Sequence, residues 1–264
     1  MKAEVVGLNG KPSGEVEVPG VFATAQRPDL VKRMFWLIGS HALQPQGRDP
    51  LAGERTTAET HSPPTGTGRS RIPRVKGDRY SKGGLAAGVA SVVKGRLPHP
   101  PKSEKVIHLG ANKKENRLAT ESAIAYTANL DAVRARGHKV QKLSLPLVVA
   151  DDVETVEKTG ELVSFFEKVD LKAELERVDR STKRNTGKRR LRGRVYRTGV
   201  GPLIVVTNDR GIGKAAAGIP GVRVTRVDSL SVLDLAPGGV PGRLTLWTES
   251  ALGALQSRRK GAAS

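Results

Sequence analysis

The feature that most constrains the fold of this chain is a long tract without hydrophobic periodicity. The tract runs from Gln44 to Lys105, between an apolar helix-like run at 30–43 and a second one at 114–136. Compact domains rarely contain a connection longer than about 15 residues that has no structure of its own, unless it is functional or disordered. This tract is several times longer. We therefore expect an extended loop that folds onto another molecule.

The composition of the tract indicates that its partner is a polyanion. Twelve Lys and Arg side chains are opposed by only five Asp and Glu side chains. Nine glycines allow close approach to a phosphate chain, and eight prolines keep helix and strand from forming. The alternative is a solvated loop whose charge only aids solubility. Aliphatic side chains within 68–77 and 84–93 favour a packed, bound loop instead. The basic residues that we expect to bind RNA are Arg48, Arg55, Arg69, Arg71, Arg74, Lys76, Arg79, Lys82, Lys94 and Arg96.

The net charge of the whole chain favours the same class of partner. Its 45 Lys and Arg against 26 Asp and Glu give a formal charge of +19, in the range typical of nucleic-acid binders. An anionic membrane is the competing polyanion, but no apolar run approaches the roughly 20 residues needed to span a bilayer, and no basic amphipathic helix is evident. The N-terminus lacks the pattern of a signal peptide. We expect a cytoplasmic protein with no membrane partner.

The mode of RNA binding is limited by what the chain lacks. It has no cysteine, which excludes zinc fingers, ribbons and knuckles built on thiolates. Aromatic residues make up only 3% of the chain, and most lie in apolar stretches where we expect core packing. These are Phe22, Phe35, Trp36, Phe165, Phe166 and Trp247, which leaves Tyr80, Tyr126 and Tyr196. The interpretation that follows is a protein that grips the backbone of a folded RNA and reads few bases.

Outside the tract, strand-like and helix-like patterns alternate. Short strands that are apolar throughout and alternate with helices are typical of a mainly parallel sheet covered on both faces. We expect an α/β fold, a Rossmann-like three-layer domain formed by residues 1–43 and 106–264, with the extended loop 44–105 inserted in it. The predicted elements are a hairpin (3–8 and 14–18), helices from Pro28 and at 116–137, 153–178 and 249–258, and strands at 145–150, 202–207, 222–227 and 243–247.

A second basic insertion, at 180–200, interrupts the predicted domain. Its stretch 180–197 contains nine basic residues and no acid. A localisation-type signal or a merely solvated run is the alternative, but two independent basic insertions in one scaffold favour RNA. Binding through them should depend steeply on salt. The residues that we expect to contact RNA here are Arg180, Lys183, Arg184, Lys188, Arg189, Arg190, Arg192, Arg194 and Arg197.

One strand-to-helix turn, Thr207–Lys214, stands where phosphate-binding loops are found. Gly211 and Gly213 give G-x-G, but Ala216 replaces the third glycine of the dinucleotide fingerprint and no P-loop pattern occurs. The favoured interpretation is a plain turn whose amides could meet an RNA phosphate.

Acidic residues and histidines provide no clear catalytic constellation. Asp151, Asp152, Glu154 and Glu157 follow a strand and could hold Mg²⁺ or act in acid–base chemistry. Capping of the following helix by Asp151 or Asp152 is the favoured interpretation. The five histidines lack metal-ligand spacing. We expect no catalytic residue, no metal and no cofactor, and hence no enzyme.

Four stretches, in this order, carry a family resemblance: Gln44–Leu51, Gly66–Gly77, Lys113–Arg117 and Gly201–Val206. With them the chain resembles the large-subunit ribosomal protein four family, in the form found in archaea and, with longer tails, in eukaryotes. The resemblance extends over nearly the whole chain.

The resemblance implies a structural constituent of the large ribosomal subunit that binds large-subunit rRNA and supports its assembly. It further implies that the globular domain lies near the outer surface of the subunit, and that the loop reaches the wall of the nascent-peptide exit tunnel with a tip within Thr65–Gly84. Candidate contacts of the tip are Arg69, Arg71, Arg74, Lys76 and Arg79. The implied partners are rRNA, neighbouring ribosomal proteins and the nascent peptide. The alternatives are an RNA-modifying enzyme with a nucleotide cofactor near Asp209–Lys214, and a free RNA-binding regulator.

Overall fold

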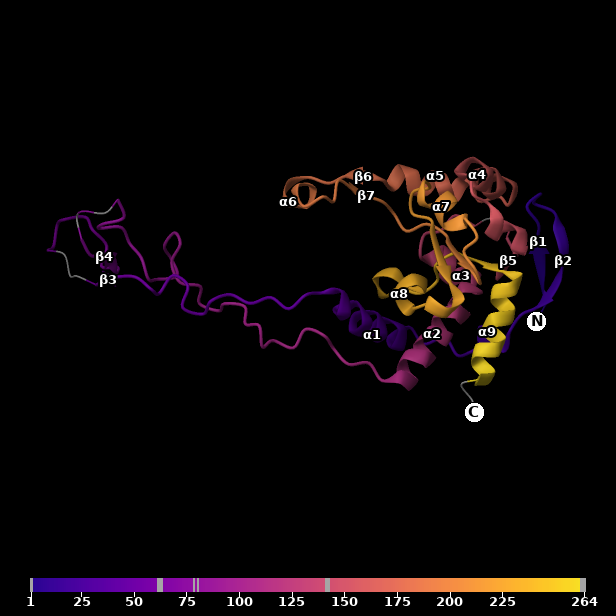
Figure 1. The fold of residues 1–264 in the computed structure, drawn as a ribbon, viewed down its shortest axis with the longest axis horizontal. Coiled ribbons are helices and arrows are strands. Elements are labelled where there is room, and N and C mark those ends of the chain that lie inside the picture. The colour runs from indigo at the N-terminus through magenta and orange to yellow at the C-terminus, as the bar shows by residue number, and fades with distance from the viewer. Residues whose placement is uncertain (1, 61–63, 78, 80, 141–142, 262–264) are drawn as a thin grey trace. The chain divides into compact units, whose positions relative to one another are not determined.

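The structure, a computed structural model, describes residues 2–60, 64–77, 79, 81–140 and 143–261, so His61 and Tyr80 lie outside the described residues. The chain divides into two compact units (Figure 1). Unit 1 comprises Met1–Gly39 with Gly110–Ser264, and unit 2 is the intervening segment Ser40–Leu109.

Unit 1 is built on a six-stranded sheet with the order β2-β1-β5-β10-β8-β9. Only β1 and β2 pair antiparallel, which confirms the predicted N-terminal hairpin, and all other neighbours are parallel. The sheet is therefore mainly parallel, as the alternation of strand and helix patterns predicted. The strands are β1 (Lys2–Val6), β2 (Pro12–Glu17), β5 (Leu147–Val149), β8 (Leu203–Val206), β9 (Arg223–Arg226) and β10 (Thr245–Thr248).

Helices cover both faces of this sheet because consecutive residues of the central strands point to opposite sides. Val148 and Trp247 belong to one hydrophobic cluster, and Leu147 and Leu246 belong to the other. The first cluster packs against η1 (Gly20–Ala23), α1 (Pro28–Gly39), α2 (Lys113–Thr127), η4 (Val227–Ser229), α8 (Val232–Leu235) and α9 (Glu249–Gly261). The second packs against α3 (Leu130–Ala135), η3 (Asp151–Thr155), α4 (Thr159–Lys168), the start of α5 (Lys172–Ser181) and α7 (Ile212–Ala217). A short turn, η5 (Pro237–Gly239), follows α8.

The prediction of a single helix at 116–137 is wrong. The structure has two helices, α2 and α3, with a break at Ala128–Asn129. The side-chain oxygen of Asn129 accepts hydrogen bonds from the backbone N–H groups of Asp131 and Ala132, at 3.0 and 3.3 Å. Asn129 is thus the N-cap of a new helix. The apolar spacing continues across the break, which is why periodicity alone did not reveal it.

The expected burial of Trp36 is also wrong, since its side chain is 64% exposed. The buried residues of α1 are Val31 and Met34. Trp36 lies two positions beyond Met34, about 200° around the helix, and so points away from the core. The other five aromatic residues expected in the core are buried or packed against it.

Unit 2 consists of two chain segments that run side by side from η2 (Ser40–Ala42) to a small hairpin (Figure 1). Hydrogen bonds join the segments, with His41 Nε2 2.8 Å from the Leu109 carbonyl oxygen and the Arg48 N–H donating to Pro101. The hairpin pairs β3 (Ala58–Glu59) with β4 (Arg74–Val75), although no strand was predicted in this tract. None of the residues described between 41 and 109 is buried. The described part of the loop therefore has no hydrophobic core of its own.

Candidate nucleic-acid interface

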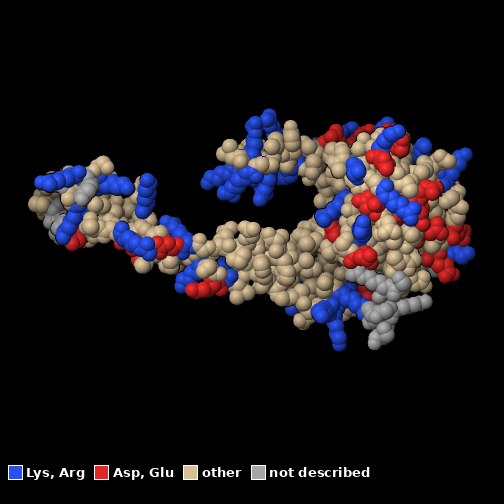
Figure 2. Space-filling model, in the orientation of Figure 1, with Lys and Arg blue, Asp and Glu red and all other residues tan. Residues whose placement is uncertain are grey.

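The net charge of the chain is confined to three segments. The tract 44–105 has 12 basic and five acidic residues, 180–197 has nine basic residues and no acid, and 258–260 adds three basic residues. The rest of the chain has 21 of each sign and is formally neutral. On the face shown in Figure 2, Lys and Arg gather over the segment around α6 and along unit 2, whereas both signs are mixed on the rest of unit 1. The positive charge thus belongs to the extensions.

Glycine lets the two segments of unit 2 approach each other closely near the middle. Gly53 has φ +87°, and a Cβ placed on it would lie 2.5 Å from the carbonyl oxygen of Gly95. Any side chain at Gly53 would clash with the opposite segment, and its left-handed backbone also favours glycine. The narrow two-segment form of the loop therefore depends on this position.

The basic residues expected to bind RNA in the loop are spread along its length and not gathered in one pocket. All ten are exposed except Arg74, which is partly buried and donates from Nη1 to the Gly84 carbonyl at 2.9 Å. Lys76 pairs with Glu59 at 2.6 Å and Arg55 with Asp49 at 3.1 Å. Exposed ion pairs of this kind contribute little to stability, so phosphate can replace the carboxylate at low cost. Arg74 shapes the hairpin, and the others face outward.

The second basic insertion forms a hairpin that the sequence did not predict. β6 (Lys183–Arg184) and β7 (Tyr196–Arg197) pair antiparallel, and the short helix α6 (Gly187–Leu191) lies between them. We call residues 183–197 the arm. Asn185 closes it, because its N–H donates to the Val195 carbonyl at 2.8 Å and its Nδ2 donates to the Arg194 carbonyl at 2.9 Å. The arm is ordered by backbone bonds and has no buried residue.

Eight cations of the arm are available to a ligand. Within the described residues, none of them forms an ion pair with an acidic side chain; they are Lys183, Arg184, Lys188, Arg189, Arg190, Arg192, Arg194 and Arg197. Arg180, just before the arm, pairs with Glu176 at 3.1 Å. The high density of like charge, with no internal compensation, suits a partner with closely spaced negative charge.

A buried polar network anchors the root of the arm to the body. Glu174 accepts hydrogen bonds from Arg177 and from His138 Nδ1, both at 2.6 Å, and from the Lys139 N–H. Arg177 also donates to the Val200 carbonyl at 2.7 Å, just after the arm. The Ser181 hydroxyl oxygen accepts from the Gly199 N–H at 3.0 Å. Both ends of the arm are therefore fixed to α5.

The pKa values in this network show that a charged Glu174 is part of the native state. Burial alone would raise its pKa, but hydrogen bonds from Arg177, His138 and the Lys139 N–H lower it to about 2. Burial lowers the pKa of His138, although Glu174 acts in the opposite direction. The carboxylate thus stays ionised while the buried imidazole resists protonation.

Two amides of the turn before α7 are already bonded within the protein, which leaves fewer of them for an RNA phosphate. The Asp209 side chain accepts hydrogen bonds from the N–H groups of Gly211 and Gly213, each at 3.1 Å. These two hydrogen bonds lower the pKa of Asp209, and the bond from Gly213 has the larger effect. A Cβ on Gly211 would lie 2.8 Å from Cγ of Glu157. Two carboxylates at this turn disfavour a phosphate group and hence a nucleotide cofactor.

The acidic group after β5 has a structural role that differs from the predicted cap. Asp151 accepts from the N–H of Ser250 at 2.9 Å, so it caps α9 and not the helix that follows it. Glu154 is buried and accepts from the Thr207 N–H and the Thr248 hydroxyl, which joins the ends of β8 and β10. Within the described residues, no three His, Cys, Asp or Glu side chains are grouped to hold a metal ion.

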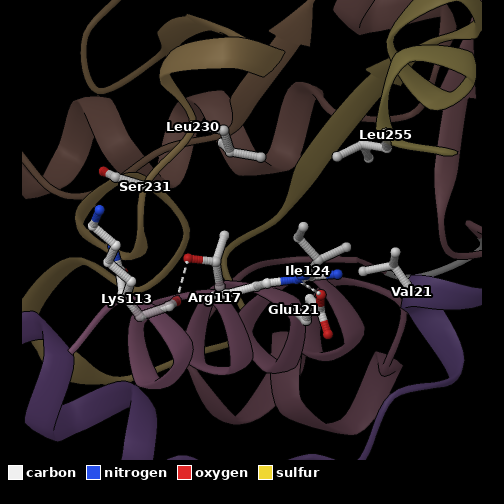
Figure 3. A pocket seen from close by; sticks show the side chains of 10 residues that line it. Val21, Lys113, Arg117, Glu121, Ile124, Leu230, Ser231 and Leu255 are labelled. Atoms are coloured by element: carbon white, nitrogen blue, oxygen red, sulfur yellow. Dashed lines mark hydrogen bonds and ion pairs between the residues drawn. The ribbon is translucent and has the colours of Figure 1, made fainter. Parts of the chain in front are cut away.

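A cavity of about 320 Å³ lies between α2, α9 and the segment Leu230–Ser231 that follows η4 in unit 1 (Figure 3). Val21, Ile124, Leu230 and Leu255 form its apolar side. Lys113, Asn116 and Arg117 of the resemblance motif also line it, and the Arg117 Nε donates to Glu121 Oε1 at 3.1 Å. The carboxylate of Glu121 in this cavity is thus held by Arg117. Among the described residues, no helix is both long enough and apolar enough to span a membrane.

An α/β body of nearly balanced charge with two exposed basic extensions is the arrangement typical of proteins that bind a large polyanion. Comparison with known proteins specifies the family. The ribosomal protein L4/L1 family matches residues 16–258. The chain is 43% identical to large ribosomal subunit protein uL4 of Methanosphaera stadtmanae over 95% of each chain. It is 42% identical to the protein of that name from Methanocaldococcus jannaschii, over 98% of this chain and 99% of the relative. It is 40% identical to the one from Sulfolobus acidocaldarius, over 98% and 96%. The chain belongs to the ribosomal protein L4/L1 family.

Proposed function

We propose that this protein is a structural constituent of the large ribosomal subunit that binds large-subunit rRNA. Family membership and relatives named as large-subunit proteins support the ribosomal role. The exposure of the loop is the observation that supports contact with rRNA. None of the residues described between 41 and 109 is buried, and 12 basic residues lie in this segment. A segment that cannot cover itself gains order when a polyanion covers it.

The proposal assigns the binding of rRNA to both extensions. The loop 44–105 and the insertion 180–200 contact rRNA through the basic residues named above, and residues 1–43 with 106–264 form the globular domain. The parallel sheet with helices on both faces supports describing that domain as Rossmann-like. Neutralised phosphate repulsion then allows rRNA helices to pack together during assembly.

We extend the proposal to the tip of the loop. The family resemblance implies that residues within 65–84 reach the wall of the nascent-peptide tunnel, where the passing peptide and neighbouring ribosomal proteins are further partners. The exposed Arg69, Arg71 and Arg79 near β4 support a contact surface at this end of unit 2.

Sedimentation of a cell lysate through a sucrose gradient after a high-salt wash tests the proposal. We expect the protein at one copy per large subunit. Recovery mainly at the top of the gradient would contradict it and favour a free RNA-binding regulator. The enzyme alternative has no support in the structure, because carboxylates occupy the turn at Asp209–Lys214.

A further inference from the structure

We propose that the arm holds an unpaired nucleotide of its RNA, with the base stacked on Tyr196 and the flanking phosphates bound by arginines. The inference deepens the proposed function and rests on it, since it assumes that the arm contacts RNA. It assigns to the arm a binding site for single-stranded nucleotides in addition to non-specific attraction to phosphate.

A hollow in the arm has the size and lining for a nucleobase. Its volume is about 500 Å³, and it is formed within the arm alone. Asn185 and Val195 are partly buried, and Tyr196 is 65% exposed. Three arginines surround them. The lining residues are Asn185, Arg189, Gly193, Arg194, Val195, Tyr196 and Arg197.

Hydrogen bonds hold the backbone that surrounds this open hollow. The two hydrogen bonds of Asn185 fix the strand that contains Val195. Gly193, at φ +79°, turns the chain, and its N–H donates to the Arg190 carbonyl while the Arg194 N–H donates to Arg189. The root is fixed by Arg177 and Ser181. A preformed site loses little conformational entropy when a ligand binds.

The chemistry of the lining favours an unpaired base over a paired one. An exposed aromatic ring costs solubility unless a partner covers it, and stacking with a base is the usual use of such a ring beside arginines in RNA-binding proteins. In a continuous duplex both faces of each base are covered by neighbouring pairs. An unpaired base presents a free face to Tyr196, and the guanidinium groups of Arg189, Arg194 and Arg197 are close enough to bind its phosphates or to stack.

Binding of the full-length protein to two RNAs tests the inference. The first RNA is a blunt-ended duplex of two strands with a randomised bulge, and the second is the same duplex without the bulge, so that every base is paired. We expect the wild type to bind the bulged pool more tightly. Tyr196→Phe should keep this preference, and Tyr196→Ala should reduce it about tenfold while leaving duplex affinity unchanged, because one stacking contact is lost.

A matched control comes from the same arm. Leu191 is 86% exposed and does not line the hollow. Leu191→Ala should therefore retain the preference for the bulge. Both side chains are exposed, so the melting temperature of each variant should equal that of the wild type.

Each result has a distinct meaning. A preference that survives Tyr196→Ala, or that falls equally in Leu191→Ala, would overturn the inference. Equal binding of both RNAs by the wild type would also overturn it and would leave the proposed function intact. Binding of neither RNA would overturn both the inference and the proposed function.

Discussion

At the scale of single residues, Arg243 shows how a buried cation can hold loops together. It is 4% exposed, and it donates to the carbonyl oxygens of Gly201 and Asp234, each at 2.9 Å. Burial lowers its pKa to about 10, so it remains charged at neutral pH. The guanidinium thus joins the loop before β8 to the end of α8.

Replacing Arg243 should destabilise the body strongly. Arg243→Met leaves at least two buried carbonyl groups without their donor, which we expect to cost about 3 to 5 kcal/mol in the free energy of unfolding. Urea unfolding followed by circular dichroism measures this. Arg226→Met, at an exposed position in β9, is the control and should change the value by less than about 0.5 kcal/mol. Equal effects of both substitutions would contradict the role given to Arg243.

His138 and Glu174 give the stability a pH dependence of known sign. Both have a lowered pKa in the folded state. The unfolded chain therefore binds more protons on acidification, and stability is lost as the pH falls. The loss from His138 begins near its ordinary pKa of about 6.5. The loss of stability from Glu174 follows as the pH falls from about 4.5 to about 2, and it amounts to about 3 kcal/mol in the free energy of unfolding.

Unfolding in urea at pH 7 and pH 5 separates the contribution of His138. The wild type should be less stable at pH 5. His138→Gln keeps a polar group beside Glu174 but does not titrate, so its stability should fall less between the two pH values. An identical fall in both proteins would show that other groups cause the dependence.

At the scale of elements, the arm should bind RNA through its own charge and not through the net charge of the chain. Changing Lys188, Arg189, Arg190 and Arg192 to Gln should reduce the slope of log K against log salt by about 3, because each phosphate contact contributes about 0.7 to 0.9. Filter binding over a range of salt concentrations measures the slope.

The body offers a matched control for this experiment. Changing Lys158, Lys168, Lys172 and Lys214 to Gln removes the same number of charges from the body of unit 1. This variant should keep the wild-type slope. If both variants lose the same slope, binding depends on total charge and the arm has no special role.

The loop should be dispensable for folding. None of the residues described between 41 and 109 is buried, so deletion of Gly66–Gly84 removes no core packing from unit 1. We expect a cooperative thermal transition within a few degrees of the wild type, measured by calorimetry. Loss of the cooperative transition would show that the loop contributes to the core.

Sequence patterns predicted the elements whose periodicity reflects burial. The strands β5 and β8 were identified because all their residues are buried and apolar, and β10 because Leu246 and Trp247 lie at its centre although threonines stand at both ends. The break at Asn129 was missed because a side-chain cap overrode a continuing apolar period. The hairpin of the arm was missed because its order comes from backbone bonds of Asn185 and not from hydrophobic residues.

At the scale of the whole molecule, folding and RNA binding are assigned to different parts of the chain. The body carries the core and has a formal charge of only +4, and the extensions carry most of the positive charge. The basic residues of the candidate site were predictable because composition alone reveals charge. The ion-pair partners of these residues, such as Glu59 for Lys76, depend on the pairing of β3 with β4. Strands of two residues are too short to give a recognisable sequence pattern, so this pairing could not be predicted.

A chain without both 44–105 and the arm should fold but not retain RNA. Removing them leaves 25 Lys and Arg against 21 Asp and Glu, a formal charge of +4. We expect a cooperative melt together with loss of binding to large-subunit rRNA at physiological salt, measured by gel shift. Binding as tight as that of the full-length protein would place the RNA interface on the body.

The uncovered loop also has a consequence for the amount of protein in the cell. Exposed backbone without core packing is where proteases cut first. If the loop binds rRNA as proposed, copies that find no rRNA leave the described part of 41–109 accessible, and assembly covers it. Surplus protein should therefore be degraded from the loop inward, so that the supply of rRNA sets the lifetime of its own binding partner.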